Sequence, residues 1–425
     1  MKSLSFTIPS ARLPYQLHCL LWLPDNQDIP PSLAHVPQSY DEDYTSAELP
    51  RVRGTIQLMH GMCEHLGRYS HVARQLTAQG YVVFGMDMPG HGKSVPDSTQ
   101  LGHIPLDEDV DGLLADEHAL FTLVNSCYDA STPHFLLGHS LGSLLARAFL
   151  ARFKPDVRAV ALIGAGQVSP VLRTLGSALT RLLVALRNDQ YRSRFIDALG
   201  AGAYAKAFQP ARTPFDWLSR NPQVVDAYLR DPLCGAPFSV ASYLVTSHIL
   251  RVIAVETPLI FSKQRNEQAL QTSQSAGTLH STGTQQLTST PHASNVSQPR
   301  VQRDGTCTVT SFTCAYAPSS DAFSRVAILF CSGVDDVVGN RGKGVMQAAK
   351  SLVKAGFSRV TVRLYDHARH EVLNEDCAPD VVRAIVAWFD DAALSHVPAG
   401  QPLAQPSAAH EPIAATPSVP PRQKA

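Results

Sequence analysis

Apolar residues along the chain fall into short, nearly continuous runs that are separated by segments with helical spacing. The runs occupy residues 55–59, 81–86, 133–137, 159–164, 326–331 and 360–365. Continuous runs of this length are typical of strands that are buried on both faces of a parallel sheet. Their alternation with helices predicts βαβ units, and so an α/β fold with a mostly parallel central sheet and helices on both faces.

Segments with apolar residues at every third or fourth position lie between these runs. They predict helices over residues 69–79, 107–128, 143–150, 344–355 and 380–394, and the apolar stretch at residues 4–23 predicts a strand hairpin. Gly80 and Gly356 stand where C-terminal helix caps are expected. These elements form two parts of one core, residues 1–166 and 321–395.

The alternation stops between residues 167 and 256, where the pattern is helical and no core strand is evident. An insertion that contributes helices alone predicts a helical cap over the carboxyl edge of the sheet. Apolar residues recur there at helical spacing, opposite arginines: Val171, Leu175, Leu179, Leu182, Leu183 and Leu186. The favoured interpretation is a helix that packs on its own domain, and the alternative is a transient contact of the cap with a membrane surface.

Three segments show neither the continuous apolar runs of strands nor the helical spacing of apolar residues. Residues 24–50 are acidic and contain several prolines, which predicts an inserted surface loop. Residues 257–320 form a second insertion, expected to be largely disordered because residues 263–303 are rich in Ser, Thr and Gln and poor in large apolar side chains. Residues 396–425 are rich in Ala, Pro and Gln, which predicts a disordered tail.

Composition narrows the range of functions. With 36 Lys plus Arg against 36 Asp plus Glu among 425 residues, no net charge points to nucleic acid or to anionic lipid. The eight cysteines contain no C-x-x-C pair, which argues against a zinc site and favours reduced thiols. The chain has no apolar signal-peptide core and no membrane-spanning run, so we expect it to be soluble and cytoplasmic.

The candidate chemistry centres on a G-x-S-x-G sequence at residues 138–142, with Ser140 in the middle. It follows an apolar strand and precedes the helix at residues 143–150, which is the context of a nucleophile elbow. The two glycines allow a cramped turn that a Cβ would obstruct, and the helix N-terminus favours a negative charge that develops near Ser140. A strand-to-helix turn without chemistry is the alternative interpretation.

A serine nucleophile needs a base, and the base needs an acid that orients it. In a parallel α/β sheet both are expected at the carboxyl ends of later strands, in the chain order Ser, acid, His. Asp335 and Asp336 follow the strand at residues 326–331, and His370 follows the last strand. His367 competes with His370 for the role of base, and the pattern alone leaves open which aspartate serves.

An oxyanion hole needs two backbone N–H donors. The N–H of Leu141, directly after the candidate nucleophile, is the first, and the N–H of Met62, in the loop after residues 55–59, is the expected second. Asp87 and the glycines that follow it lack the spacing of a phosphate-binding loop, so they predict a structural turn. This chemistry requires neither a metal nor a cofactor.

Together these segments resemble one family, the α/β-hydrolases of the monoacylglycerol lipase and lysophospholipase group (Hydrolase-4, serine aminopeptidase S33 type). The resemblance rests on four segments: H-G-x-x-E-H-x-x-R-Y at residues 60–69, D-M-P-G-H-G-K-S at 87–94, the G-x-S-x-G sequence, and A-R-H-E at 368–371. It covers roughly residues 1–255 and 320–395. In this family the acid is the second aspartate of a G-x-D-D-P-V-like loop, which implies Asp336, with Val337 in place of the usual proline.

The resemblance implies a serine hydrolase with a helical cap that cleaves carboxylic esters carrying an acyl chain, such as a monoacylglycerol or a lysophospholipid. Its catalytic residues would be Ser140, His370 and Asp336. A thioesterase or a small-ester esterase on the same triad is one alternative. A non-catalytic interaction protein that uses residues 263–303 is another, but it predicts a broken triad, whereas all three positions are occupied. The expected partner is a small acyl ester, and the pattern gives no oligomeric state.

Overall fold

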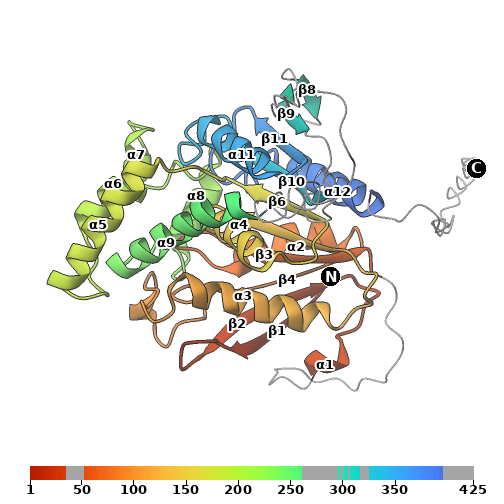
Figure 1. Cartoon of the computed structure of the whole chain (residues 1–425), viewed down its shortest axis with the longest axis horizontal. Helices are drawn as coiled ribbons and strands as arrows, with labels where there is room; N and C mark the ends of the chain where they lie inside the picture. The colour runs from red at the N-terminus through yellow and green to blue at the C-terminus, as the bar shows by residue number, and fades with distance from the viewer. Residues whose placement is uncertain (35–51, 261–294, 297–299, 305–306, 316–324, 396–425) are drawn as a thin grey trace, which may run out of the picture.

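The apolar runs form the middle of one large sheet, as predicted. The computed structural model describes residues 1–34, 52–260, 295–296, 300–304, 307–315 and 325–395. Its strands are β1 (Lys2–Pro9), β2 (Gln16–Leu23), β3 (Gly54–Met59), β4 (Tyr81–Met86), β5 (His134–His139), β6 (Ala159–Ile163), β7 (Asn295–Val296), β8 (Arg300–Asp304), β9 (Cys307–Ala315), β10 (Ala327–Gly333) and β11 (Arg359–Tyr365). Within the described residues they form one sheet in the order β1-β2-β4-β3-β5-β6-β10-β11-β9-β7, with β8 paired to β9 (Figure 1).

The centre of this sheet is parallel and its flanks are antiparallel. Strands β4, β3, β5, β6, β10 and β11 pair in parallel. The β1–β2 hairpin extends one side through β4, and β9 pairs with β11 on the other. Because parallel strands end at the same edge, the loops after β3, β5, β10 and β11 meet there. This edge carries the residues that sequence analysis singled out.

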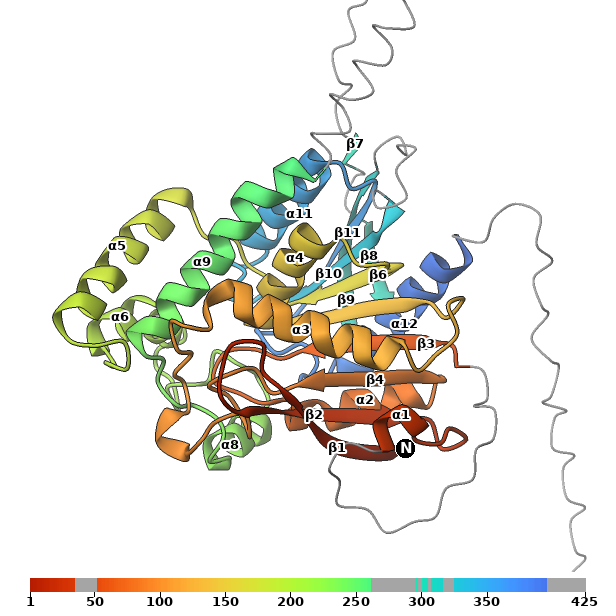
Figure 2. The ribbon, with the colours of Figure 1, turned by 60° about the horizontal axis from the view of Figure 1, so that its bottom comes forward.

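Helices cover both faces of the sheet, also as predicted. They are α1 (Pro31–Ala34), α2 (Ser70–Thr77), α3 (Asp109–Asn125), α4 (Leu141–Phe153), α5 (Pro170–Leu186), α6 (Arg194–Leu199), α7 (Ala201–Lys206), α8 (Pro222–Arg230), α9 (Val240–Glu256), α11 (Lys343–Ala355) and α12 (Ala378–Leu394), with short 3₁₀ turns at Leu66–Tyr69, Ser98–Gln100 and Thr257–Leu259. The apolar cluster on one face unites α3, α4, α9 and α11, and that on the other unites α2 and α12 (Figures 1 and 2). Among the residues that the structure describes, no helix is long and apolar enough to cross a bilayer.

The helical insertion divides into a protruding part and a helix of the core. Helix α9 packs against α3 and α4 and buries Val245, Ile249 and Ile253 in the main apolar cluster. Residues 240–256 therefore belong to the helix layer, although sequence analysis assigned residues 167–256 as a whole to the cap. Helix α5 packs on α9 and, with α6, stands beyond the end of the sheet (Figure 2).

The helix α5 packs on its own domain through α9, as the favoured interpretation expected, but most of its apolar stripe faces solvent. Val171, Leu175, Leu182 and Leu186 are 54–69% exposed. Helix α5 contacts α9 around Thr180, which is buried, and the neighbouring stripe residues Leu179 and Leu183 are half-buried. Helical spacing identifies an apolar face but not what covers it, and within the described residues this face stays uncovered.

The second insertion contributes strands to the sheet, which its composition did not predict. Strands β8 and β9 lie within the segment 257–320 that was expected to be largely disordered, and β9 pairs with the full length of β11. Val309 of β9 is fully buried in the apolar cluster of α2 and α12. Residues 35–51 of the first inserted loop, most of residues 263–303 and the tail 396–425 lie outside the described residues.

Candidate active site

Ser140 stands at a sharp turn between β5 and α4, as a nucleophile elbow requires. Its φ and ψ are 51° and −115°, a region that residues other than glycine rarely occupy, and its N–H donates to Ile163 O at 2.9 Å. A Cβ at Gly138 would lie 2.5 Å from Gly142 O, and one at Gly142 would lie 2.1 Å from Met59 O. Both glycines are therefore needed for close backbone approach, and the turn holds Ser140 at the N-terminus of α4.

His370 and Asp336 form a buried pair in the loops that follow β11 and β10. His370 Nδ1 donates to Asp336 Oδ1 at 3.1 Å, and neither side chain is more than 2% exposed. Asp336 also accepts from the Ser332 hydroxyl at 2.9 Å and from the Val338 N–H at 2.9 Å. The carboxylate thus orients the imidazole through Nδ1, which leaves Nε2 for another partner.

Burial and charge oppose one another in this pair. Burial acts to raise the pKa of Asp336, but the charge of His370 and the hydrogen bonds to the carboxylate lower it below its ordinary value. Burial acts to lower the pKa of His370, but the charge of Asp336 and their hydrogen bond raise it above its ordinary value. The pair therefore favours an anionic Asp336 and an imidazole that accepts a proton readily, as a general base must.

The competing residues of the sequence analysis lie in different surroundings. His367 is exposed and does not line the cavity that Ser140 lines. Asp335 is also partly exposed, and its carboxylate lies 3.4 Å from Arg220 Nη1 instead of a histidine. Of the two pairs of candidates, the structure brings together His370 and Asp336.

The loop after β3 lies directly beside the elbow. A Cβ at Gly61 would lie 3.2 Å from Ser140 Cβ. His60 Nδ1 donates to Gly61 O at 2.8 Å while its Nε2 accepts a main-chain N–H at 2.9 Å, so the ring is neutral, and burial lowers its pKa. Met62 and Leu141 line the same cavity as Ser140, and within the described residues neither of their backbone N–H groups has a hydrogen-bond partner.

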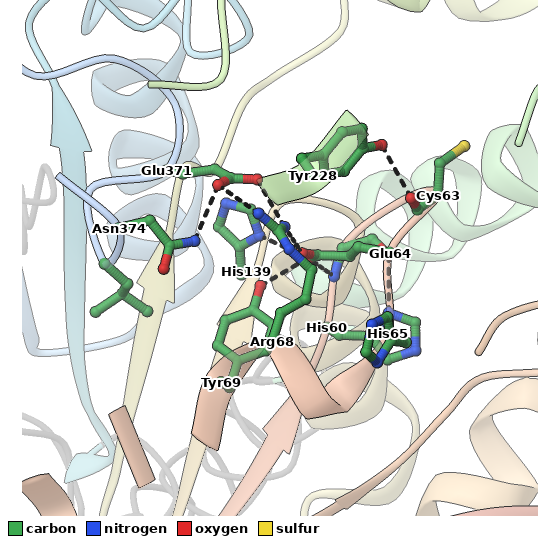
Figure 3. A network of polar contacts seen from close by, with 12 residues as sticks. His60, Cys63, Glu64, His65, Arg68, Tyr69, His139, Tyr228, Glu371 and Asn374 are labelled. Atoms are coloured by element: carbon green, nitrogen blue, oxygen red, sulfur yellow. Dashed lines mark hydrogen bonds and ion pairs between the residues drawn. The ribbon is translucent and has the colours of Figure 1, made fainter. Parts of the chain in front are cut away.

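A buried carboxylate joins this loop to the elbow (Figure 3). Glu64 Oε1 accepts from the Gly61 N–H at 2.5 Å and from the Tyr69 hydroxyl at 2.6 Å. The same oxygen accepts from Nδ1 of His139, the residue before Ser140, at 3.0 Å. Burial acts to raise the pKa of Glu64, but the opposite charge of Arg68 and the contacts with His139 hold it well below its ordinary value.

Arg68 extends the network to the loop that carries His370. Its guanidinium forms a bidentate pair with Glu371, at 2.8 Å for each bond, and its Nη1 also contacts Glu64. Its Cζ lies 4.9 Å from the centre of the Tyr228 ring on α8. The loops after β3, β5 and β11 and one cap helix therefore meet at a single ion-pair network (Figure 3). Sequence analysis quoted Glu64, Arg68 and Glu371 within its motifs but assigned them no role. No local sequence pattern indicates that Arg68 pairs with Glu371, because the two residues lie far apart in the chain.

Ser140 and His370 line one cavity of about 290 Å³, to which the core loops and cap residues both contribute. Its apolar lining includes Leu144, Val168, Phe215, Trp217, Leu250 and Val338. The Trp217 ring lies 5.3 Å from that of His370. An apolar cavity with a few polar groups at one place can hold an apolar chain and orient a polar group attached to it.

The turn at Asp87 has the structural role that sequence analysis predicted. Its carboxylate accepts from the N–H groups of Leu66 and Lys93 at 2.8 and 2.9 Å and contacts His18 Nδ1 at 2.9 Å. Burial acts to raise the pKa of Asp87, but the contact with His18, the charge of His60 and the Lys93 N–H lower it to about 2. A Cβ at Gly92 would lie 2.3 Å from the carboxylate, so the turn closes tightly on its own side chain.

The fold has solved counterparts. A thermostable carboxyl esterase from Bacillus coagulans superimposes with a TM-score of 0.67 at 20% sequence identity, covering 92% of this chain and 99% of that chain. A monoacylglycerol lipase from Paleococcus ferrophilus superimposes with a TM-score of 0.53 at 17% identity, covering 89% of this chain and 100% of that one. These likenesses, together with the sheet order, define the fold as that of an α/β-hydrolase.

Comparison with known sequences gives a more specific likeness than the fold does. Residues 50–254 match the Hydrolase_4 family, described as serine aminopeptidase S33. A monoacylglycerol lipase of Mycolicibacterium smegmatis is 29% identical over 219 residues, which cover 49% of this chain and 68% of that protein. Human monoglyceride lipase is 30% identical over 196 residues, covering 44% and 55%. The chain thus has the α/β-hydrolase fold and is similar to the monoacylglycerol lipases, in line with the resemblance, and the proteins that it matches are named as lipases and esterases.

Proposed function

We propose that this chain hydrolyses carboxylic esters of acyl-chain substrates, in the manner of a monoacylglycerol lipase or lysophospholipase, through the triad Ser140, His370 and Asp336. The observation that carries the proposal is the buried His370–Asp336 pair at the cavity that Ser140 lines. A histidine that is oriented through Nδ1 and has a raised pKa suits the deprotonation of a serine hydroxyl.

The reaction follows from these positions. His370 Nε2 takes the proton of Ser140 Oγ as that oxygen attacks the ester carbonyl, and Asp336 stabilises the resulting imidazolium. The backbone N–H groups of Met62 and Leu141 bind the oxyanion, and the imidazolium then gives its proton to the leaving alcohol. Water, activated by His370, attacks the acyl-enzyme and releases the acid and free Ser140. The steps use protein groups and water alone.

The proposed substrate class rests on the cavity and on the relatives. Its apolar lining suits an acyl chain, and the names of the relatives, monoacylglycerol lipase and monoglyceride lipase, point to glycerol esters. The exposed apolar face of α5, with Leu175 and Leu182, supports a transient contact between the cap and a lipid surface on which such esters reside.

The test combines a fluorophosphonate probe with p-nitrophenyl esters of increasing chain length and a matched acyl thioester. We expect the unmodified chain to be labelled and to hydrolyse long esters faster than acetate, and Ser140→Ala to do neither. Ser126→Ala, which removes an exposed hydroxyl, is the control and retains both properties. A preference for short esters or for the thioester would replace the lipase proposal, and an unlabelled chain would favour a non-catalytic interaction protein.

A further inference from the structure

We infer that His65, Asp231 and Cys234 form a binding site for a divalent cation of the zinc class, which links the cap to the core. One donor atom from each residue lies within 4.8 Å of the other two. His65 Nε2 and Asp231 Oδ2 are 2.9 Å apart already. Within the described residues, no other group of histidine, cysteine and carboxylate side chains converges in this way.

The local backbone holds the donors toward one another. Asp231 follows α8 in a turn in which its Oδ1 accepts from the Leu233 N–H at 2.9 Å and its carbonyl from the Cys234 N–H at 3.0 Å. With Oδ1 used by the turn, Oδ2 is the oxygen that faces His65. On the core side, a Cβ at residue 67 would lie 2.9 Å from His65 Cε1, so Gly67 makes room for the imidazole.

The donor set selects the ion. Imidazole, carboxylate and thiolate together suit zinc, whereas magnesium and calcium prefer oxygen donors alone. Tetrahedral zinc places its ligand atoms roughly 3.3–3.7 Å apart. Donor atoms that lie up to 4.8 Å apart therefore need to close by up to about 1.5 Å, and the His65–Asp231 pair at 2.9 Å needs to open slightly. The three side chains are only partly buried, and side-chain rotation supplies this movement. Three protein ligands leave the fourth position to water.

The surrounding charge also favours a cation. The Cys234 thiol lies within electrostatic reach of Arg68, Asp231, Glu64 and Glu371. Three carboxylates and one guanidinium therefore act on this position, and the excess of negative charge lowers the cost of bringing in a divalent ion. The cysteine pattern, which argued against a zinc site, could not reveal such a cluster, because the fold and not a local C-x-x-C spacing brings together residues that are 166 positions apart.

An ion at this position would hold the cap to the core beside the cavity. Gly235, next to Cys234, lines the cavity and its N–H donates to Cys63 O at 2.9 Å. His65 lies in the same core loop as Met62, the proposed oxyanion donor. A bound ion would thus hold the cap segment against the loop that binds the reacting carbonyl, in addition to this single main-chain hydrogen bond.

The test uses the full chain, purified after exposure to a chelator and with its thiols reduced. Calorimetric titration with zinc chloride is expected to show one equivalent bound, and cobalt(II) is expected to give a near-ultraviolet thiolate charge-transfer band. Cys234→Ser is expected to abolish the band, and His65→Gln and Cys234→Ser to weaken zinc binding by ~100-fold or more. Zinc should also raise the melting temperature of the unmodified chain but not of Cys234→Ser.

Cys127→Ser is the matched control, because Cys127 lies at the end of α3 outside the cluster, and it should bind and absorb as the unmodified chain does. The inference is overturned if the unmodified chain takes up no stoichiometric zinc, or if the cobalt band persists in Cys234→Ser. The spectrum of the unmodified chain decides the question even if a variant folds poorly, and neither readout depends on ester hydrolysis.

Discussion

At the scale of single residues, the protonation of His370 should set the acid limb of activity. The base must be neutral, and its pKa is raised because the attraction of Asp336 outweighs burial. Activity should therefore rise with pH through a midpoint above the ordinary histidine value of about 6.5. A profile of kcat/KM against pH, which reports groups of the free enzyme, measures this midpoint.

Asp336→Asn tests the cause of the shift. Removal of the anion leaves burial to act on the imidazole, so the acid limb should move to lower pH. The amide also favours the wrong tautomer of His370, so kcat should fall by a factor on the order of 10⁴. Asp335→Asn, which alters the neighbouring exposed carboxylate, should change neither quantity. An acid limb that stays in place in Asp336→Asn would exclude this aspartate as its cause.

Glu64 should act as a positioning residue. In Glu64→Gln one oxygen can still accept from Gly61, but an amide NH₂ then faces the cationic Arg68, so the loop with Met62 shifts. Displacements below 1 Å matter in such sites, so we expect kcat to fall by about 10–100-fold with little change in KM, because the apolar cavity is untouched. Steady-state kinetics on one p-nitrophenyl ester measures kcat and KM separately.

Glu256→Gln, which alters a carboxylate paired with Arg152 at the surface, is the control for Glu64→Gln and should keep both constants. A rise in KM at constant kcat in Glu64→Gln would show instead that the network shapes the cavity. Labelling by the fluorophosphonate probe separates a slowed enzyme from an unfolded one.

The placement of the candidate site residues could be predicted from sequence where chain order and strand ends were sufficient. Ser140, His370 and the oxyanion loop all follow strands whose carboxyl ends meet in a parallel sheet. The choice between Asp335 and Asp336 was not available from the residue pattern, since neighbours in a turn point in different directions. The role of Glu64 and Arg68 depends on three loops packing together, and no local pattern encodes that.

At the scale of elements, the carboxyl group of Glu117 on α3 is buried against Gln57 of β3. Burial raises the pKa of Glu117 to about 8, although Gln57 Nε2 donates to its carboxylate at 2.5 Å and opposes the shift. The unfolded chain ionises this group near its ordinary pKa of about 4.5, while the folded chain keeps the proton. The unfolding free energy should therefore fall as pH rises between about 5 and 8.

Glu117→Gln should remove this contribution, since the amide is neutral and can still hydrogen-bond to Gln57. Its unfolding free energy should lose a pH slope of about 1.4 kcal/mol per unit between pH 5.5 and 7.5. Glu108, whose pKa is raised to about 9 mainly by burial, adds a slope of the same sign that stays in the variant. Urea unfolding at several pH values measures the difference, and equal slopes in both proteins would contradict the protonated state of Glu117.

The elements themselves were the most predictable feature of the chain. Continuous apolar runs predicted the parallel strands, and helical spacing predicted α2, α11 and α12 within a few residues, with capping glycines after the first two. Sequence spacing does not show which element a helix packs against. It therefore could not predict that α9 joins the helix layer of the core, nor that most of the apolar face of α5 is exposed. Both depend on which neighbour the fold supplies.

At the scale of the whole molecule, the second insertion is built into the domain through one edge of the sheet. Composition suggested disorder because Ser, Thr and Gln dominate residues 263–303. The strands that follow are rich in polar residues, and they join the sheet because β9 pairs with β11 and β8 pairs with β9. Such tertiary pairing leaves little trace in local composition, which is why it was missed.

If β9 is an integral strand, its inward side chain should support the whole domain. Val309 is fully buried in the apolar cluster of α2 and α12, whereas Val301 of β8, from the same hairpin, is 68% exposed. Val309→Ala removes two buried carbons and should lower the unfolding free energy by about 2 kcal/mol. Val301→Ala removes the same atoms from a solvent-exposed position and should change the unfolding free energy by less than about 0.5 kcal/mol.

Denaturant unfolding followed by tryptophan fluorescence measures both variants. Equal small effects would mean that β9 contributes little to the stability of the domain, so that the segment could be deleted without loss of activity.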